Sequence, residues 1–274
     1  MGYKKSIGVF FEETIGDLIC TSSIVASIRK NEPEANIHVV TSDLGLEVLK
    51  SDKPDYNTIS KRFNDLHNYD TICYPIRCLQ RVPWWFKHGM HMRDLAAHSI
   101  GVELSVKSSN IVQPTDKDVS DQCRDITKQR YIIVSNRASR DRLKEVPLET
   151  MNKAMEKISN KYPTYQLGVS QDPPLSNCKS LLGETTITEA LYLIKNASLV
   201  ISIDNYLLHA AGSYGTPFVG IYGQYRWEQV GPIDKKGPFE IINKGIINNY
   251  NPEGCTKITA DEILLTFEKM EGRI

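Results

Sequence analysis

The segment from Ser198 to Gly231 constrains the fold of this chain more than any other part of its sequence. An apolar, β-branched run, Leu199–Ile203, is typical of a buried parallel strand. Apolar side chains at helical spacing follow over Asn205–Ser213, and a second β-branched run covers Thr216–Tyr222. A strand, a helix and a further strand in this order predict a βαβ unit, and hence an α/β protein with a parallel sheet.

Polar and small residues follow both strands of this unit. Open α/β sheets bind ligands outside the carboxyl ends of their strands. A helix that starts at such an edge also directs its first backbone N–H groups at the ligand, which favours phosphate. The sequence therefore predicts a ligand-binding edge at Asp204, Asn205, Tyr206, Gly223 and Gln224.

The same alternation of strands and helices extends over both halves of the chain. Besides the βαβ unit, the expected strands are Ile7–Phe11, Asn36–Thr41, Thr71–Tyr74, Tyr131–Ser135, Tyr165–Val169 and Phe239–Ile242. The expected helices are Asp17–Lys30, which is predicted to be amphipathic, Leu44–Lys50, Gly89–Ile100, Pro147–Lys161, Thr188–Asn196 and Ala260–Met270. The polar stretch Ile111–Asp121, with its proline, is the predicted linker between two doubly wound sheets.

Charge, hydropathy and cysteine usage limit the class of protein. The 274 residues contain 33 Lys and Arg and 33 Asp and Glu, so the net charge of zero argues against broad binding to nucleic acid or anionic membrane. No apolar run approaches the roughly 20 residues of a transmembrane helix. The six cysteines are scattered without a C-x-x-C pair, which is typical of reduced thiols. We therefore expect a soluble cytoplasmic protein.

Three motifs, taken in order along the chain, resemble glycosyltransferase family 9, the heptosyltransferase-type enzymes. Ile15–Thr21 is similar to the family's G-D-x-x-x-T, and Lys144–Glu149 to K-x-W-P-x-E with valine in place of tryptophan. The segment after Ile203 resembles D-T-G-x-x-H-x-A-A-x-x-G-T-P, with Asn205 and Tyr206 where the family has threonine and glycine. The resemblance implies an α/β fold of the GT-B type, in which two Rossmann-like, doubly wound lobes face a central cleft. We expect residues 1–118 to form the acceptor-side lobe and residues 119–274 the lobe that binds the nucleotide sugar.

Asp17 is the candidate catalytic residue. It stands between a predicted strand and a predicted helix, where the residues alone favour an ordinary helix cap. The resemblance implies that this aspartate is a general base. Sugar transfer with inversion requires a carboxylate that accepts the proton of the acceptor hydroxyl as it attacks the anomeric carbon.

The donor candidates gather in the second half of the chain. The resemblance implies that Lys144 contacts the donor diphosphate, next to the helix N-terminus at Asp204–Tyr206 and the border formed by Gly223 and Gln224. Further donor candidates are Arg137, Arg140, Asp172 and His209. For the two arginines the alternative is a solvated basic loop. For His209 a core position is the favoured interpretation, and Asp172 fits a ribose contact or a simple turn.

A stretch of mixed aromatic and basic residues in the first half is the candidate acceptor surface, since aromatic rings stack on sugars and cations hold phosphates. Its candidate residues are Arg81, Trp84, Trp85, Lys87, His91 and Arg93. The alternative is a loop whose tryptophans pack on the lobe. The histidines of this stretch lack the H-E-x-x-H pattern of a zinc site, so neither a metal nor a cofactor is expected.

The resulting hypothesis is an inverting, metal-independent glycosyltransferase that moves a heptose-like sugar from a nucleotide diphosphate, with an ADP-linked sugar as one candidate. Its acceptor would be a lipopolysaccharide-core sugar, another glycan, a protein side chain or a modified nucleobase. Work at the inner membrane face without membrane insertion would fit the first of these. Two alternatives remain: a nucleotide-sugar-binding protein with weakened catalysis, and a sugar-nucleotide epimerase.

Overall fold

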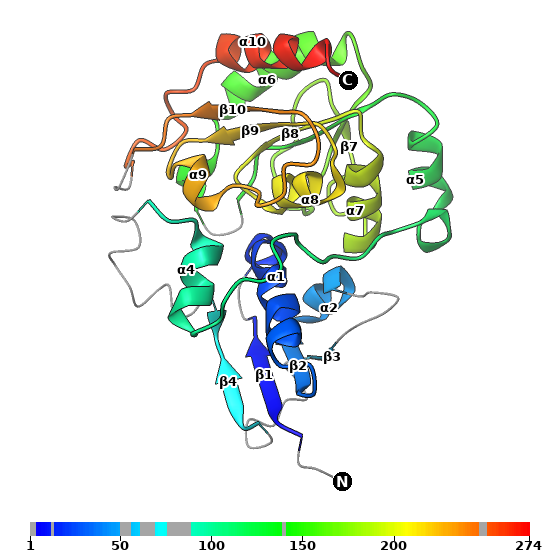
Figure 1. Cartoon of the computed structure of the whole chain (residues 1–274). Helices are drawn as coiled ribbons and strands as arrows, with labels where there is room; N and C mark the ends of the chain where they lie inside the picture. Colours follow the sequence, from blue (N-terminus) through cyan, green and yellow to red (C-terminus); the bar gives the residue numbers. More distant parts are fainter. Residues whose placement is uncertain are drawn as a thin grey trace. The chain divides into compact units, whose positions relative to one another are not determined.

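The computed structural model describes residues 4–11, 14–49, 56–60, 69–75, 89–138, 141–246 and 251–274 (Figure 1). The chain divides into two compact units, Met1–Gln113 and Pro114–Ile274. The division falls inside the stretch predicted as a linker, slightly before the boundary expected at residue 118. No helix in the described part of the chain has the length and apolar character that crossing a membrane would require.

The N-terminal unit is built on a four-stranded parallel sheet with the strand order β3-β2-β1-β4. Its strands are β1 (Ser6–Phe10), β2 (Asn36–Thr41), β3 (Asn57–Ser60) and β4 (Thr71–Cys73). Its helices are α1 (Ile15–Asn31), α2 (Asp43–Leu49) and α4 (Met92–Ser99), and α1 packs against both α2 and α4. The order of the first strands is that of a Rossmann half.

Helix α1 is buried on nearly all of its faces, so the prediction that it is amphipathic is wrong. Of its buried hydroxyl side chains, those of Thr21, Ser22 and Ser27 form hydrogen bonds, which makes their burial tolerable. Ser22 Oγ donates to the carbonyl of Ile19 over 2.8 Å and accepts from the backbone N–H of Asn110 over 3.0 Å. Ser27 Oγ accepts from the N–H of Val106 over 3.0 Å. These polar residues of the helix therefore form hydrogen bonds inside the N-terminal unit and do not make a solvent-facing stripe.

The C-terminal unit contains a six-stranded parallel sheet with the order β10-β9-β8-β5-β6-β7. Its strands are β5 (Ile132–Ser135), β6 (Thr164–Gln166), β7 (Lys179–Ser180), β8 (Leu199–Ile203), β9 (Phe218–Tyr222) and β10 (Phe239–Asn243). Its helical segments are η4 (Asp116–Asp118), α5 (Asp121–Ile126), η5 (Arg142–Lys144), α6 (Leu148–Ser159), α7 (Ile187–Asn196), α8 (Tyr206–Tyr214), α9 (Trp227–Val230) and α10 (Ala260–Glu271). Counted along the chain, this order is that of the doubly wound dinucleotide-binding fold.

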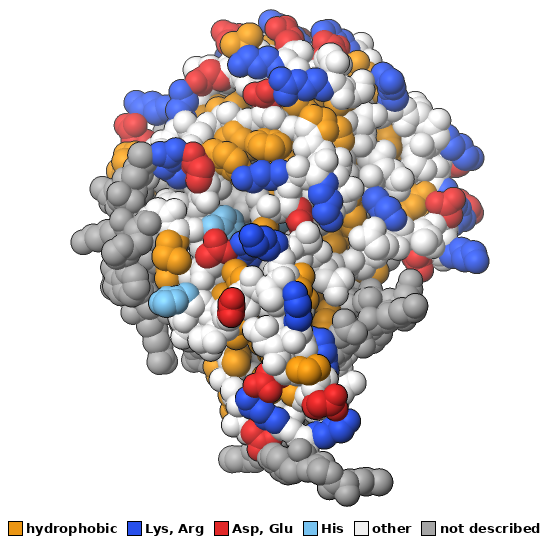
Figure 2. Space-filling model, viewed as in Figure 1, with side chains coloured by type: hydrophobic (Ala, Val, Ile, Leu, Met, Phe, Trp, Pro, Cys, Tyr) orange, Lys and Arg blue, Asp and Glu red, His pale blue; other side chains and the backbone are white. Residues whose placement is uncertain are grey.

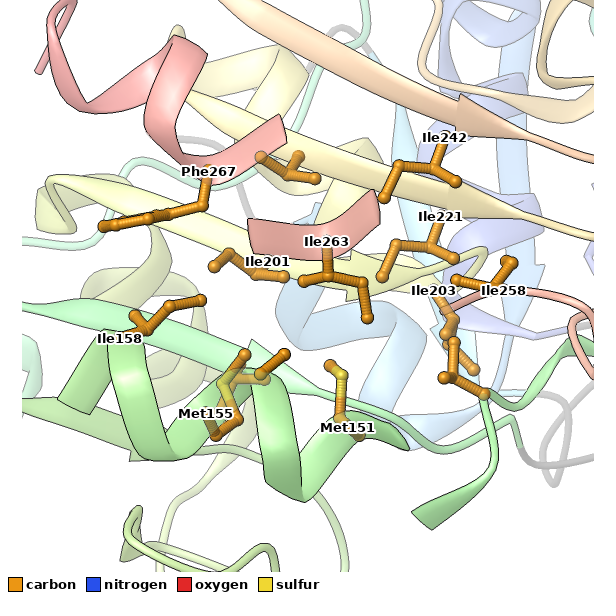
Figure 3. Packing of buried hydrophobic residues seen from close by; sticks show 14 of the residues in the cluster. Met151, Met155, Ile158, Ile201, Ile203, Ile221, Ile242, Ile258, Ile263 and Phe267 are labelled. Atoms are coloured by element: carbon orange, nitrogen blue, oxygen red, sulfur yellow. The ribbon is translucent and has the colours of Figure 1, made fainter. Parts of the chain in front are cut away.

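Helices cover both faces of this second sheet, with α6 and α10 on one face and α7 and α8 on the other (Figure 1). Figure 3 shows the layer under α6 and α10, where Met155 of α6 and Phe267 of α10 approach Ile201 of β8. All three side chains are at most 2% exposed. This continuous apolar layer fixes the orientation of the sheet's carboxyl edge, which carries the polar residues.

The predicted βαβ unit is confirmed. β8 has the predicted bounds and pairs in parallel with β9, with Ile201 opposite Val219. The connecting helix α8 ends at Gly215, whose φ of 82° is left-handed and favours glycine. The order of strands reverses between β8 and β5, which pair in parallel from Ile132 to Ser135. Such a reversal, the topological switch point, is where open α/β sheets bind their ligands.

Candidate functional site

Asn205 ties together the two chain segments that leave the sheet at the switch point. It follows β8, and its Nδ2 donates to Ser135 Oγ and to the carbonyl of Arg137, each over 3.3 Å. Both of these groups lie at the carboxyl end of β5. The corner after β8 predicted as a ligand-binding edge is therefore joined to the neighbouring strand across the switch point.

The same side chain caps helix α8. Asn205 Oδ1 accepts from the N–H of Leu207 over 2.9 Å and from Ser202 Oγ over 3.0 Å. Asparagine is among the most favoured N-cap residues, so Asn205 is well suited to start this helix. Burial, followed by the nearby Asp172 carboxylate, raises the pKa of the Tyr206 phenol above its usual range.

Lys144 and Asp204 form an ion pair at this edge although they are 60 residues apart. Lys144 is the last residue of η5, and its Nζ lies 2.6 Å from Asp204 Oδ2. The lysine side chain is 26% exposed and that of the aspartate 10%, so the lysine is partly exposed while its carboxylate partner is nearly covered. The ring of Tyr225 lies 6.0 Å from the same ammonium. The structure thus brings a partly exposed cation to the start of helix α8.

Arg137 and Asp172 also come together. Arg137 Nη1 lies 3.0 Å from Glu145 Oε2, and its Nε lies 3.5 Å from Asp172 Oδ1. Asp172 Oδ2 accepts from the N–H of Val169 over 3.0 Å, which is the turn contact considered as the alternative for this residue. Two carboxylates thus offset the charge of Arg137. The further donor candidate Arg140 lies outside the described residues.

Asn136 is a residue of this site that the sequence reasoning missed. It follows β5 directly, is 7% exposed, and forms two hydrogen bonds with the backbone of Val146. Its Nδ2 donates to the Val146 carbonyl over 2.8 Å, and its Oδ1 accepts from the Val146 N–H over 3.0 Å. These two hydrogen bonds fix the backbone at Val146, two residues after Lys144. The signal was present, because a polar residue directly after a buried strand also marks Asp204.

Gly223 and Gln224, predicted at the same edge, are engaged in contacts within the C-terminal unit. A side chain at Gly223 would collide with Gly254 and Cys255, and its carbonyl accepts from Asn251 Nδ2 over 2.9 Å. Gln224 is 1% exposed and its Nε2 donates to Asp141 Oδ2. His209 is 6% exposed within α8, at the core position favoured from the sequence.

Asp17 lies at the start of α1, in the N-terminal unit. Thr14 and Asp17 form a reciprocal capping box, in which Asp17 Oδ2 accepts from Thr14 Oγ1 over 2.9 Å and from the Thr14 N–H over 3.2 Å. The aspartate is only partly buried, so a carboxylate stands at a helix N-terminus, where the helix dipole stabilises its charged form.

Of the acceptor candidates, the structure describes His91 and Arg93, whereas Arg81, Trp84, Trp85 and Lys87 lie outside the described residues. His91 caps α4, since its Nδ1 accepts from the N–H of Arg93 over 3.1 Å. The Arg93 guanidinium donates to Asp94 and to the carbonyl of Lys107. Both side chains thus have local structural partners.

Potential metal ligands do not gather in the described part of the chain, where no group of three or more His, Cys, Asp or Glu side chains is close enough to hold an ion. The positive charge of this edge comes from side chains and from the helix N-terminus. Figure 2 shows lysine and arginine side chains interspersed with acidic ones over the visible face, in keeping with the zero net charge.

Comparison with protein families matches residues 79–239, more than half of the chain, to glycosyltransferase family 9 (heptosyltransferase). No curated protein sequence matches the chain. The structural comparisons agree with the family match. A family 9 glycosyltransferase from Veillonella parvula is 17% identical, with a TM-score of 0.68 and 97% of each chain covered.

Two further structures are similar over nearly the whole chain. The ADP-heptose LPS heptosyltransferase II of E. coli is 16% identical, with a TM-score of 0.63, covering 97% of this chain and 98% of that one. The iron-containing dodecameric glycosyltransferase TibC of enterotoxigenic E. coli is 12% identical, with a TM-score of 0.74, covering 98% of this chain and 76% of that one. Together with the two Rossmann-like units, these likenesses confirm the predicted α/β fold of the GT-B type.

Proposed function

The chain belongs to glycosyltransferase family 9 and is a nucleotide-sugar glycosyltransferase, and we propose that it works by inversion, without a metal ion, and with an ADP-linked heptose-like sugar as donor. The observation that carries this proposal is the partly exposed Lys144 side chain, whose ammonium pairs with the Asp204 carboxylate beside the start of α8. The donor is inferred from the name of the similar E. coli enzyme, an ADP-heptose heptosyltransferase.

The donor contacts follow from the charges at the switch point. A nucleoside diphosphate leaves with additional negative charge, which a cation and backbone N–H groups can stabilise in place of a metal ion. Lys144 supplies the cation and the first turn of α8 supplies the N–H groups. In this proposal Asn205 and Tyr206 shape the pocket, while Arg137, Arg140 and Asp172 border it and His209 supports α8 from the core.

Asp17 is the proposed general base. The acceptor oxygen forms a bond to the anomeric carbon as the bond from that carbon to the diphosphate oxygen breaks. The electron pair of the broken bond leaves with the nucleoside diphosphate, and the acceptor proton moves to Asp17. Attack from the face opposite the leaving group inverts the anomeric configuration.

Binding of ADP tests the donor half of the proposal. A ligand that binds only the folded protein stabilises it by about 2.7 kcal/mol at 100 times its Kd. ADP should therefore raise the melting temperature measured by differential scanning fluorimetry, and EDTA should leave this increase unchanged. If no nucleoside diphosphate raises the melting temperature or gives a calorimetric binding signal, the proposed donor site is wrong.

The acceptor surface remains a proposal that involves Arg81, Trp84, Trp85, Lys87, His91 and Arg93, with a lipopolysaccharide-type sugar as its ligand. Replacing Arg81 and Lys87 together with alanine should raise the apparent KM for an anionic acceptor and leave ADP affinity unchanged, since binding of only one substrate is weakened. Steady-state kinetics with varied acceptor, repeated at higher salt, would measure the effect. Unchanged acceptor kinetics with a lower melting temperature would indicate a structural role for this stretch.

A further inference from the structure

A short segment near the C-terminus, Asn251–Cys255, packs against the carboxyl end of β9 and against η5. We refer to this segment as the clasp. The N–H of Asn251 donates to the carbonyl of Gln224 over 3.1 Å, and the N–H of Cys255 donates to the carbonyl of Leu143 over 2.9 Å. The clasp therefore connects Gln224, the second residue after β9, to the turn that carries Lys144.

The contact is close enough to require glycine on both sides. Gly254 has a φ of 53°, and a side chain there would collide with the carbonyl of Leu143. Gly223 likewise has no space for a side chain beside Gly254 and Cys255. Burial, and next the nearby Asp204 carboxylate, raise the pKa of the Cys255 thiol to about 12. Backbone packed this tightly leaves η5 little freedom to move.

The side chain of Gln224 also connects the segment after β9 to η5. Its Nε2 donates to Asp141 Oδ2, while Asp141 Oδ1 accepts from the N–H of Leu143 over 3.0 Å. The N–H of Lys144 donates to the Asp141 carbonyl over 3.2 Å. Asp141 is thus the N-cap of η5, and Gln224 fixes the orientation of its carboxylate.

We propose that Gln224 and the clasp are positioning elements that hold η5 so that the Lys144 ammonium meets the donor diphosphate. This inference rests on the proposed function. Gln224 itself is 1% exposed and thus acts on the ligand through Asp141 and Lys144. A lysine side chain has a flexible four-carbon stem, so the position of its backbone decides where its charge can be presented.

A Gln224→Glu variant provides a readout that a structural role alone would not produce. At pH 7.5 its carboxylate would face that of Asp141, and the two like charges would push η5 away. At pH 5.5 two close carboxylates share a proton, because repulsion raises the pKa of one of them, and the protonated group can donate as Nε2 did. We expect ADP affinity about 10-fold or more below wild type at pH 7.5 and a much smaller deficit at pH 5.5.

Isothermal titration with ADP and with adenosine, each normalised to wild type at the same pH, would measure this effect. A Gln224→Met variant has no donor at either pH and should lose ADP affinity at both. Affinity for adenosine, which has no phosphate, should not change in either variant. Gln224→Glu with wild-type ADP affinity at pH 7.5 would overturn the positioning role, even if its melting temperature falls.

Gly254→Ala tests the clasp independently. We expect it to weaken ADP binding without affecting adenosine binding, because the new side chain displaces Leu143. Gly101→Ala is the matched control, since Gly101 has a similar φ of 70° but open space around it. If both variants bind ADP equally well, the clasp has no positioning role. Failure of the wild-type protein to bind ADP would instead overturn the proposed function, and the positioning role with it.

Discussion

An Asp17→Asn variant is expected to transfer sugar about 100-fold or more slowly than wild type, while its affinity for ADP stays the same. The amide cannot accept the proton of the acceptor hydroxyl. It retains a side-chain oxygen that can accept from Thr14, as Asp17 Oδ2 does over 2.9 Å and 3.2 Å. The initial rate of ADP release from ADP-heptose, together with a calorimetric Kd for ADP, would separate loss of catalysis from loss of binding.

The chain offers a matched control for the capping function of Asp17. Thr186 and Glu189 form the same kind of capping box at the start of α7, where Glu189 Oε2 accepts from the Thr186 N–H over 2.9 Å. Glu189→Gln should change the melting temperature about as much as Asp17→Asn does, because both variants alter the same kind of cap. It should leave turnover unchanged. Turnover close to wild type in Asp17→Asn would mean that Asp17 is a helix cap and that another group is the base.

The strands of the sheet cores could be predicted from the sequence because burial on both faces leaves continuous β-branched runs. Leu199–Ile203 has the observed bounds for this reason. In contrast, β7 consists of two exposed residues, Lys179 and Ser180, at the edge of the sheet, so no apolar pattern marks it. Helix α1 was wrongly predicted to be amphipathic, since its serines and threonine are polar residues but lie buried in the fold.

The candidate site could be predicted only as far as local pattern and family resemblance reach. Both Lys144 and Asp204 lie in motifs that resemble the family. The local sequence around each does not predict that Lys144 Nζ and Asp204 Oδ2 lie 2.6 Å apart. The two hydrogen bonds between Asn136 and Val146 depend on where β5 ends relative to η5, which is a property of the folded protein. Long-range contacts of this kind leave no periodic signal in the sequence.

The clasp shows the same limit more strongly. Gly223 is predicted from the sequence to border the donor site, whereas the space that a side chain there would need is taken by Gly254 and Cys255. A glycine after a strand carries the same sequence signal in both situations. Only the folded positions of residues more than 25 apart distinguish them, which is why the sequence reasoning missed the positioning elements.

The ion pair of Lys144 and Asp204 determines what removal of the lysine should do. In the folded protein, the Asp204 carboxylate is 10% exposed and has the ammonium as its near neighbour. Without Lys144, the donor diphosphate would lose a charged hydrogen-bond partner and would also meet an uncompensated negative charge. Both effects act on the phosphates and leave the nucleoside part of the ligand unaffected.

Lys144→Ala should therefore weaken ADP binding by roughly 1–3 kcal/mol and change adenosine binding far less. The double variant Lys144→Ala/Asp204→Asn should recover part of the lost affinity, because it removes the uncompensated charge. Lys161→Ala is the control, because it removes an ion pair beyond the C-terminal end of α6. In that pair Lys161 Nζ lies 2.9 Å from Glu271 Oε2. The control variant should leave ADP affinity unchanged. Calorimetric titrations with ADP and adenosine would measure all three variants. An equal loss for both ligands in Lys144→Ala would place this lysine away from the phosphates, since only a contact with the diphosphate separates the two affinities.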